Sequence, residues 1–104
     1  MEFLATFPIF AIENTTRQHA ELLGAEHPDT NQKIVFVFTE EAGAQKLADQ
    51  LGQYRVVKLA DDPDGFKQVV SQIDKEIVAF DPVVIGDHLQ VKFQARVSTI
   101  LRRQ

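Results

Sequence analysis

Acidic side chains follow three apolar runs of this 104-residue sequence, at residues 34–38, 54–59 and 77–80. Runs of this length that are rich in β-branched and aromatic residues predict strands. If the strands are parallel, their carboxyl ends meet at one edge of the sheet, where open α/β folds bind ligands. The residues expected at this acidic rim are Thr39, Glu40, Glu41, Asp61, Asp62, Asp64, Asp81 and Asp87.

An acidic rim would attract a cation, an amine or a basic partner, and it would repel phosphate. Helix capping explains the same residues without a ligand. Thr and Asp side chains accept hydrogen bonds from the free N–H groups of a first helical turn, and a carboxylate suits the positive end of the helix dipole. Both interpretations stay open at the level of sequence.

No other constellation of residues predicts chemistry. The three histidines are far apart and lack paired metal-ligand spacing; they are His19, His27 and His88. If Gly65 is placed at the sixth position of a calcium loop, Ala60 and Ser71 fall at the first and twelfth positions, where ligands are required. The sequence contains no cysteine, and no serine lies in a Gly-flanked turn typical of a nucleophile. We therefore predict no catalytic residues, no metal site and no cofactor.

Helices are expected between these strands. Thr39 is the predicted N-cap of a helix that Gly52 ends, and residues 61–65 form a turn with Pro63 at the start of the next helix. An earlier strand is expected within residues 3–12, where Pro8 predicts either an edge strand or a break, and we expect the strand to add antiparallel at an edge. The order β-β-α-β-α-β predicts one α/β domain over residues 1–104, on the borderline of α+β. Its mixed sheet would have four to five strands, three of them parallel.

The C-terminal residues 88–104 fit two structures. Alternating apolar residues from Leu89 to Val97 predict a strand, whereas the spacing of Leu89, Phe93, Val97 and Ile100 fits one face of a helix. Asp87 and Gln90 resemble a capping box, so we favour the helix. A helix would place a basic stripe on one face, consisting of Lys92, Arg96 and Arg103.

The N-terminal segment is unusually aromatic for so small a chain. Its apolar residues would form a self-association edge if they stay exposed; these are Phe3, Phe7, Ile9 and Phe10. The alternative is that the same side chains fill the core.

Charge and hydropathy narrow the classes of partner. The net charge of −4 argues against general nucleic-acid binding. The N-terminal apolar run is too short to span a bilayer, and it carries Glu2 in place of a basic leader region. We therefore expect a cytoplasmic protein without membrane or nucleic-acid partners.

The order of these motifs resembles the SseB N-terminal domain family over residues 33–101. The similar features are a strand that ends in Phe38-Thr39 before an acidic helix start, and a later short strand that ends in Asp81-Pro82. Asp81 stands where the family has Asn, and Val83 stands where Gly often follows. The resemblance implies an α/β fold with a final helix, and it brings no catalytic residues.

Together these observations predict a non-enzymatic interaction or regulatory domain. We expect its partner to be another protein or a second copy of itself, as a homodimer. The alternative function is a small-ligand or cation-binding module that uses the acidic rim.

Overall fold

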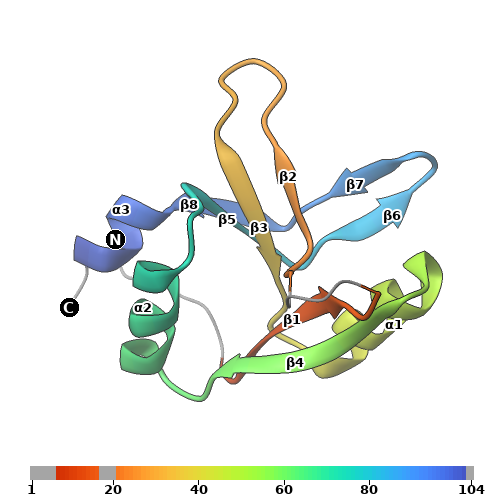
Figure 1. Ribbon diagram of the computed structural model, residues 1–104, viewed down its shortest axis with the longest axis horizontal. Helices are drawn as coiled ribbons and strands as arrows, with labels where there is room; N and C mark the ends of the chain where they lie inside the picture. The colour runs from red at the N-terminus through yellow and green to blue at the C-terminus, as the bar shows by residue number, and fades with distance from the viewer. Residues whose placement is uncertain (1–6, 17–20, 103–104) are drawn as a thin grey trace.

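The computed structural model describes residues 7–16 and 21–102, with helices and strands arranged around mixed sheets (Figure 1). The elements in chain order are β1 (Ile9–Asn14), β2 (Gly24–Glu26), β3 (Lys33–Val37), α1 (Glu41–Leu51), β4 (Tyr54–Ala60), α2 (Pro63–Gln72), β5 (Ile77–Phe80), β6 (Val83–Ile85), β7 (His88–Gln90), β8 (Phe93–Arg96) and α3 (Val97–Arg102). Within the described ranges, no helix has the length and apolar character needed to cross a membrane.

The central sheet has four strands in the order β2-β3-β5-β8. β3 and β5 pair in parallel, with Val35 opposite Val78 and Val37 opposite Phe80. β2 and β8 flank this pair, and both run antiparallel to their neighbours. The parallel pair is buried at its centre, as expected for continuous β-branched runs.

β1 and β4 form a second, antiparallel pair that lies below the central sheet in Figure 1. The other edge of β1 is also occupied, because Phe10 and Phe38 exchange two backbone hydrogen bonds of 2.8 Å. In addition, the N–H of Leu23 donates to the carbonyl of Ile12 at 2.9 Å. β1 therefore lies between β4 and the chain around β2 and β3.

This arrangement corrects two predictions. The antiparallel direction of the first strand is confirmed, and so is the predicted break, because β1 begins at Ile9, directly after Pro8. Its predicted edge position was wrong, since hydrogen bonds occupy both edges of β1. Two of the expected strands pair in parallel, not three. The physical reason is that the edge of β3 opposite β5 is occupied by β2, Leu23 and Phe10, so β4 pairs with the far edge of β1.

The helices begin and end close to the predicted residues. Gly52 ends α1 with a φ of 72°, a conformation that costs glycine little. Thr39 is not its N-cap as predicted: Glu40 holds that position and makes no side-chain cap bond. At α2, Pro63 occupies the first turn, and Oδ1 of Asp62 accepts a hydrogen bond of 2.7 Å from the N–H of Gly65.

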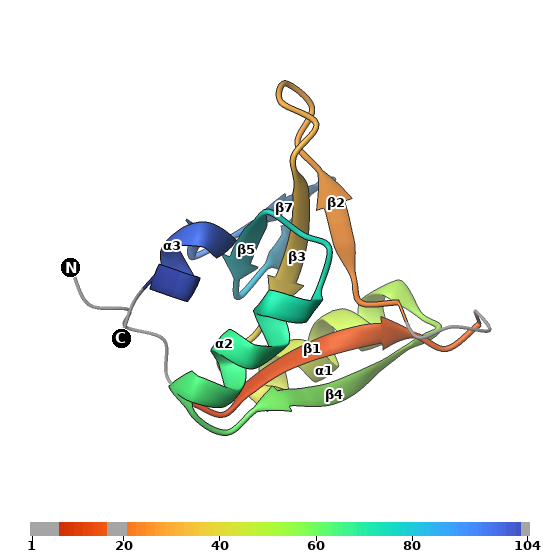
Figure 2. The ribbon, with the colours of Figure 1, turned by 60° about the vertical axis from the view of Figure 1, so that its left-hand side comes forward.

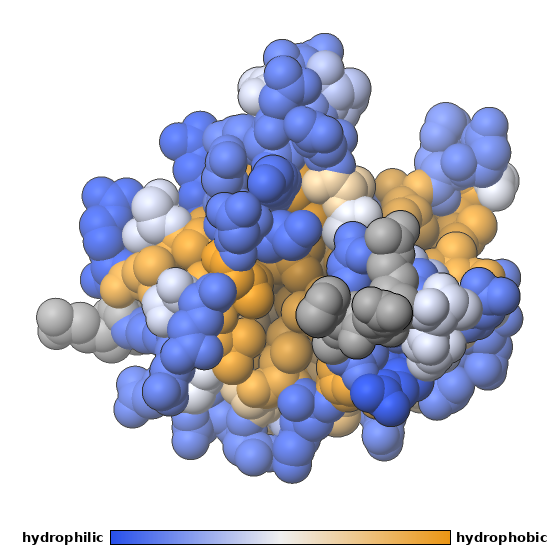
Figure 3. Space-filling model, viewed as in Figure 1, coloured by the Kyte–Doolittle hydropathy of each residue, from blue (hydrophilic) through white to orange (hydrophobic). Residues whose placement is uncertain are grey.

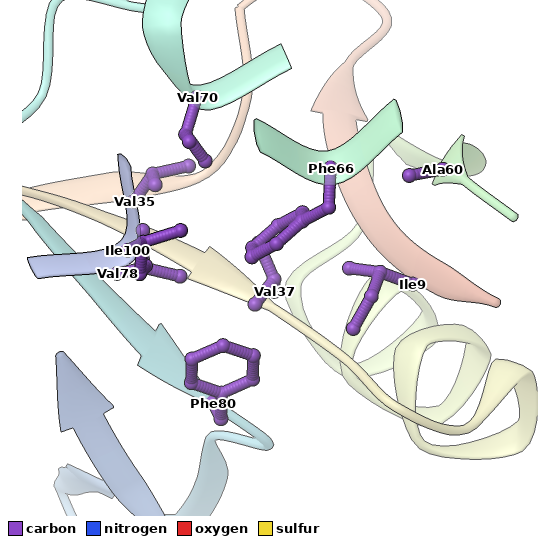
Figure 4. Packing of buried hydrophobic residues seen from close by; sticks show 9 residues of the cluster. All are labelled: Ile9, Val35, Val37, Ala60, Phe66, Val70, Val78, Phe80 and Ile100. Atoms are coloured by element: carbon purple, nitrogen blue, oxygen red, sulfur yellow. The ribbon is translucent and has the colours of Figure 1, made fainter. Parts of the chain in front are cut away.

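The core has two apolar clusters. The larger one joins β1, β3 and β5 to the two helices α2 and α3, and Phe66 of α2 points toward Val37 and Ile9 (Figure 4). Its members are Ile9, Val35, Val37, Ala60, Phe66, Val70, Val78, Phe80 and Ile100. The smaller cluster lies under α1 and consists of Ile12, Phe38, Ala44, Leu47 and Ala48.

This core includes part of the aromatic segment that was predicted as a self-association edge. Ile9 is fully buried, and Phe7 contacts Phe66 edge to face with ring centroids 6.2 Å apart. Phe10 is partly buried against the smaller cluster, and Phe3 lies outside the described residues. The described part of the segment therefore fills the core, as the alternative interpretation had it.

The C-terminal segment is mostly extended. Residues 88–90 and 93–96 are strands, and a helix begins only at Val97. The predicted helix was thus wrong up to Arg96 and is confirmed for residues 97–102. Pairing with β5 outweighs the helical spacing, because it stacks Phe93 on Phe80 with ring centroids 4.3 Å apart.

The capping bond of Asp62 leads to the first prediction. Replacing Asp62 by Ala should lower the free energy of unfolding by about 1 kcal/mol, the usual cost of losing an N-cap. Urea denaturation of Asp62→Ala measures this loss. The matched control is Asp61→Ala, which removes only an exposed ion pair with Lys58 and should cost less. Equal losses in the two variants would contradict the capping role.

Candidate functional site

Two residues join the carboxyl ends of the parallel strands. Thr39 follows β3 and Asp81 follows β5. The backbone N–H of Thr39 donates to Oδ1 of Asp81 at 2.8 Å, and its hydroxyl donates to Oδ2 at 2.7 Å. The N–H of Asp81 in turn donates to the carbonyl of Val37 at 2.8 Å. Both oxygens of this partly buried carboxylate are therefore used to hold the two strand ends together.

A pocket of about 200 Å³ opens beside this contact. Its walls come from the start of α1, the end of β5 and the chain that follows β7; they are Phe38, Thr39, Glu40, Gly43, Asp81, Pro82, Val83 and Lys92. The backbone N–H of Lys92 donates to the carbonyl of Phe80 at 2.9 Å, which places this residue at the rim. Typical small-molecule pockets start at about 300 Å³. This one has room for a single large side chain or a small polar molecule.

The predicted acidic rim is divided in the structure. Thr39, Glu40 and Asp81 line the pocket together, and Glu41 follows in the first turn of α1. The acidic residues after β4 lie elsewhere, because β4 ends beside β1 and not beside β3 and β5. Among the residues that the structure describes, no group of three or more His, Asp or Glu could hold a metal ion.

Each remaining acid has a local role or partner. Asp62 caps α2, Asp64 lies in the first turn of that helix, and Asp61 pairs with Lys58 at 2.9 Å. Asp87 is at the turn between β6 and β7, where its carboxylate lies 3.2 Å from Nε2 of His88. Capping and local ion pairs thus account for the acids after β4 and β6.

The predicted basic stripe does not form on one helix. Lys92 lies at the pocket, and Arg96 is the exposed last residue of β8. Arg103 lies outside the described residues.

A second feature is a hairpin that the sequence analysis missed. Among the described strands, β6 and β7 pair only with each other, and they extend away from the central sheet above α1, at the right of Figure 1. We call residues 83–90 the apolar arm, with Gly86 and Asp87 at its tip. Figure 3 shows the hydrophobic surface that it exposes below a hydrophilic end. Five of the seven exposed large apolar residues in the described chain belong to the arm or follow it closely, namely Val83, Val84, Ile85, Leu89 and Phe93.

The arm has a recognisable sequence pattern. Three apolar residues precede Gly86-Asp87, and Gly86 has a φ of 63°. Glycine at the first central position is typical of the two-residue turns that join antiparallel strands. The sequence analysis overlooked it because Asp87 and Gln90 also match a capping box, which assigned these residues to a helix.

The contact between Thr39 and Asp81 leads to the second prediction. Asp81→Ala should lower the free energy of unfolding by about 2–3 kcal/mol, since it removes two hydrogen bonds to a carboxylate and places Ala at a left-handed φ. That φ is 55°. Asp81→Asn should recover at least half of this loss, because Asn tolerates the conformation and keeps an acceptor oxygen. Urea denaturation of both variants checks this. An Asn variant as unstable as the Ala variant would contradict it.

No protein-family model and no curated protein sequence matches this chain. The resemblance to the SseB N-terminal domain family therefore stays a prediction. The pocket and the apolar arm are the features from which a function can be argued.

Proposed function

We propose that this protein is a non-enzymatic interaction domain that associates with a second copy of itself through the apolar arm. The observation that carries the proposal is the concentration of exposed apolar side chains on residues 83–93. Contiguous apolar surface that projects from a soluble domain is typical of protein-interaction sites. The net charge of −4 favours a protein partner over a nucleic acid.

The structure of the arm supports the same proposal. All six residues of β6 and β7 are exposed, and neither strand pairs with any other described strand. A two-stranded hairpin without further cover is only marginally stable in water. Contact with a second chain would cover its faces and give its open edges partners.

The energetics favour a weak dimer. The five apolar side chains are 37–52% exposed. Because full burial of such a side chain is worth about 1.5–3 kcal/mol, covering them in both copies would supply on the order of 10 kcal/mol. Association itself costs an estimated 4–15 kcal/mol. At the lower end of that cost about 6 kcal/mol remains, so we expect a dissociation constant of at best some tens of micromolar.

The third prediction tests the arm directly. Leu89→Gln should raise the dissociation constant of the dimer about tenfold or more, because it removes an apolar side chain from the centre of the arm. Light scattering coupled to size-exclusion chromatography over a concentration series measures the change.

Leu101→Gln is the matched control for this variant. Leu89 and Leu101 are both 41% exposed, but Leu101 lies on α3, at the opposite side of the molecule in Figure 1. The control should dimerise like the wild type. A wild-type protein that stays monomeric at several hundred micromolar, or two variants with equal effects, would overturn the proposal.

A second candidate function is small-ligand or cation binding at the pocket. It is favoured by the position of the pocket at the carboxyl ends of the parallel pair, where open α/β sheets commonly bind ligands. The carboxylates of Glu40 and Asp81 outweigh the single ammonium group of Lys92 in this pocket, and the net negative charge would favour a cation or an amine.

The fourth prediction concerns this candidate. Millimolar Mg²⁺, Ca²⁺ or spermidine should raise the melting temperature, since a ligand that binds only the folded state stabilises it. Glu40→Gln should reduce the shift, because it removes a charge from the pocket, and the side chain of Glu40 makes no capping hydrogen bond whose loss would destabilise α1. Asp49→Gln is the control, an exposed acid on α1 that does not line the pocket. The absence of a shift with every ligand would reject this candidate.

A further inference from the structure

We propose that the two arms of the dimer lie side by side and antiparallel about a two-fold axis, with Asp87 of each copy opposite Lys92 of the other. This inference rests on the proposed self-association and names the contacts that would define it. The apolar centre of each arm would face the centre of the other. The polar tip of each arm would meet the base of its partner, at Val83 and Lys92.

The length of the arm fits this arrangement. Each strand has three residues and is therefore about 10 Å long. A two-fold axis through the middle of two antiparallel arms places each tip beside the base of the other arm, and it repeats every contact twice. Val84 and Leu89 pair across the hairpin at its middle, so they would lie level with the axis when the two arms meet edge to edge. Val83 and Ile85 then lie on the other face of both arms, which is the side of the pocket that Val83 lines.

The charges of tip and base are complementary. The side chain of Asp87 is 92% exposed, and its contact with His88 leaves most of the carboxylate open to a second cation. Lys92 is exposed and forms no ion pair with any residue in the described ranges. The tip also carries His88, a cation when protonated, and the base carries Glu40 on the pocket wall. Asp87 at the tip of one copy would thus face Lys92 at the base of the other, and a protonated His88 would face Glu40.

The pocket could accommodate an apolar side chain of the partner. Ile85 is 52% exposed and immediately precedes the tip. A tip that reaches the partner's base brings its Ile85 to the pocket walls formed by Phe38, Pro82 and Val83. A pocket of about 200 Å³ has room for one such side chain, since a cavity of about 150 Å³ admits benzene. Large apolar side chains that fill a pocket on the partner often carry much of the binding energy at protein interfaces.

Charge reversal in separate copies tests the arrangement. Asp87→Lys and Lys92→Glu should each raise the dissociation constant of their own homodimer about tenfold, because each creates two like-charge contacts. A mixture of the two variants should form a one-to-one heterodimer with nearly wild-type affinity, since both contacts then join opposite charges. Native mass spectrometry separates the heterodimer from either homodimer. Arg102→Glu, a reversal on α3, controls for net charge and should dimerise like the wild type.

Cross-linking provides a second measurement that does not depend on affinity. The sequence has no cysteine, so Asp87→Cys and Lys92→Cys introduce unique thiols. Under mild oxidation the mixed variants should form a disulfide between copies, in higher yield than either variant alone. For Asp87→Cys alone, a disulfide yield equal to that of the mixture would place tip against tip and overturn the arrangement.

The outcomes separate this inference from the proposed function. If Leu89→Gln weakens the dimer but neither charge variant does, the arm is the interface and the antiparallel arrangement is wrong. If the mixture of Asp87→Lys and Lys92→Glu does not recover nearly wild-type affinity, the antiparallel arrangement is also wrong. If the wild-type protein does not dimerise at all, the proposed function fails first and this inference fails with it.

Discussion

The contact between Thr39 and Asp81 is the constraint that positions the pocket and the apolar arm, the two candidate functional features of the molecule. It holds together the carboxyl ends of β3 and β5, and two segments of the chain begin at this contact. After Thr39 the chain turns into α1, and after Asp81 it continues through Pro82 into the apolar arm. The pocket lies between these two segments. A carboxylate that accepts two hydrogen bonds at this point therefore sets the positions of helix, pocket and arm relative to each other.

A second constraint is the occupation of strand edges. β3 has two edges, and one is used by β5. The other is shared by β2, Leu23 and Phe10, which leaves no place for β4 beside it. β4 instead pairs with β1, and this pairing is strengthened by an ion pair between Glu13, the one buried charged residue of the described chain, and Arg55 opposite it. Figure 2 shows the result, with β1 and β4 forming a layer separate from the strands of the central sheet.

These constraints explain how far the sequence could predict the structure. The apolar runs, the start of α2 at Pro63 and the glycine at the end of α1 are local features, and local patterns predicted them. The partner of β4 depends on which edges are already occupied, and no local pattern carries that information. The C-terminal segment fits both the alternation of a strand and the spacing of a helical face. The stacking of Phe93 on Phe80 favours the strand, which continues up to Arg96. Of the candidate site, only Thr39, Glu40, Asp81 and Lys92 come together, because only their strands share an edge.

The ends of the arm limit how it can associate. Open strand edges invite unlimited pairing, and proteins restrict it with proline and with charge. Here Pro82 precedes β6 and lacks an N–H group, so a pairing ladder cannot extend from the arm into the body of the sheet. At the other end, the charge of Asp87 opposes stacking of one tip on another. In the dimer that we propose, an arm with both ends restricted would pair over its short apolar centre only, and two such arms related by a two-fold axis would form a closed dimer rather than a fibre.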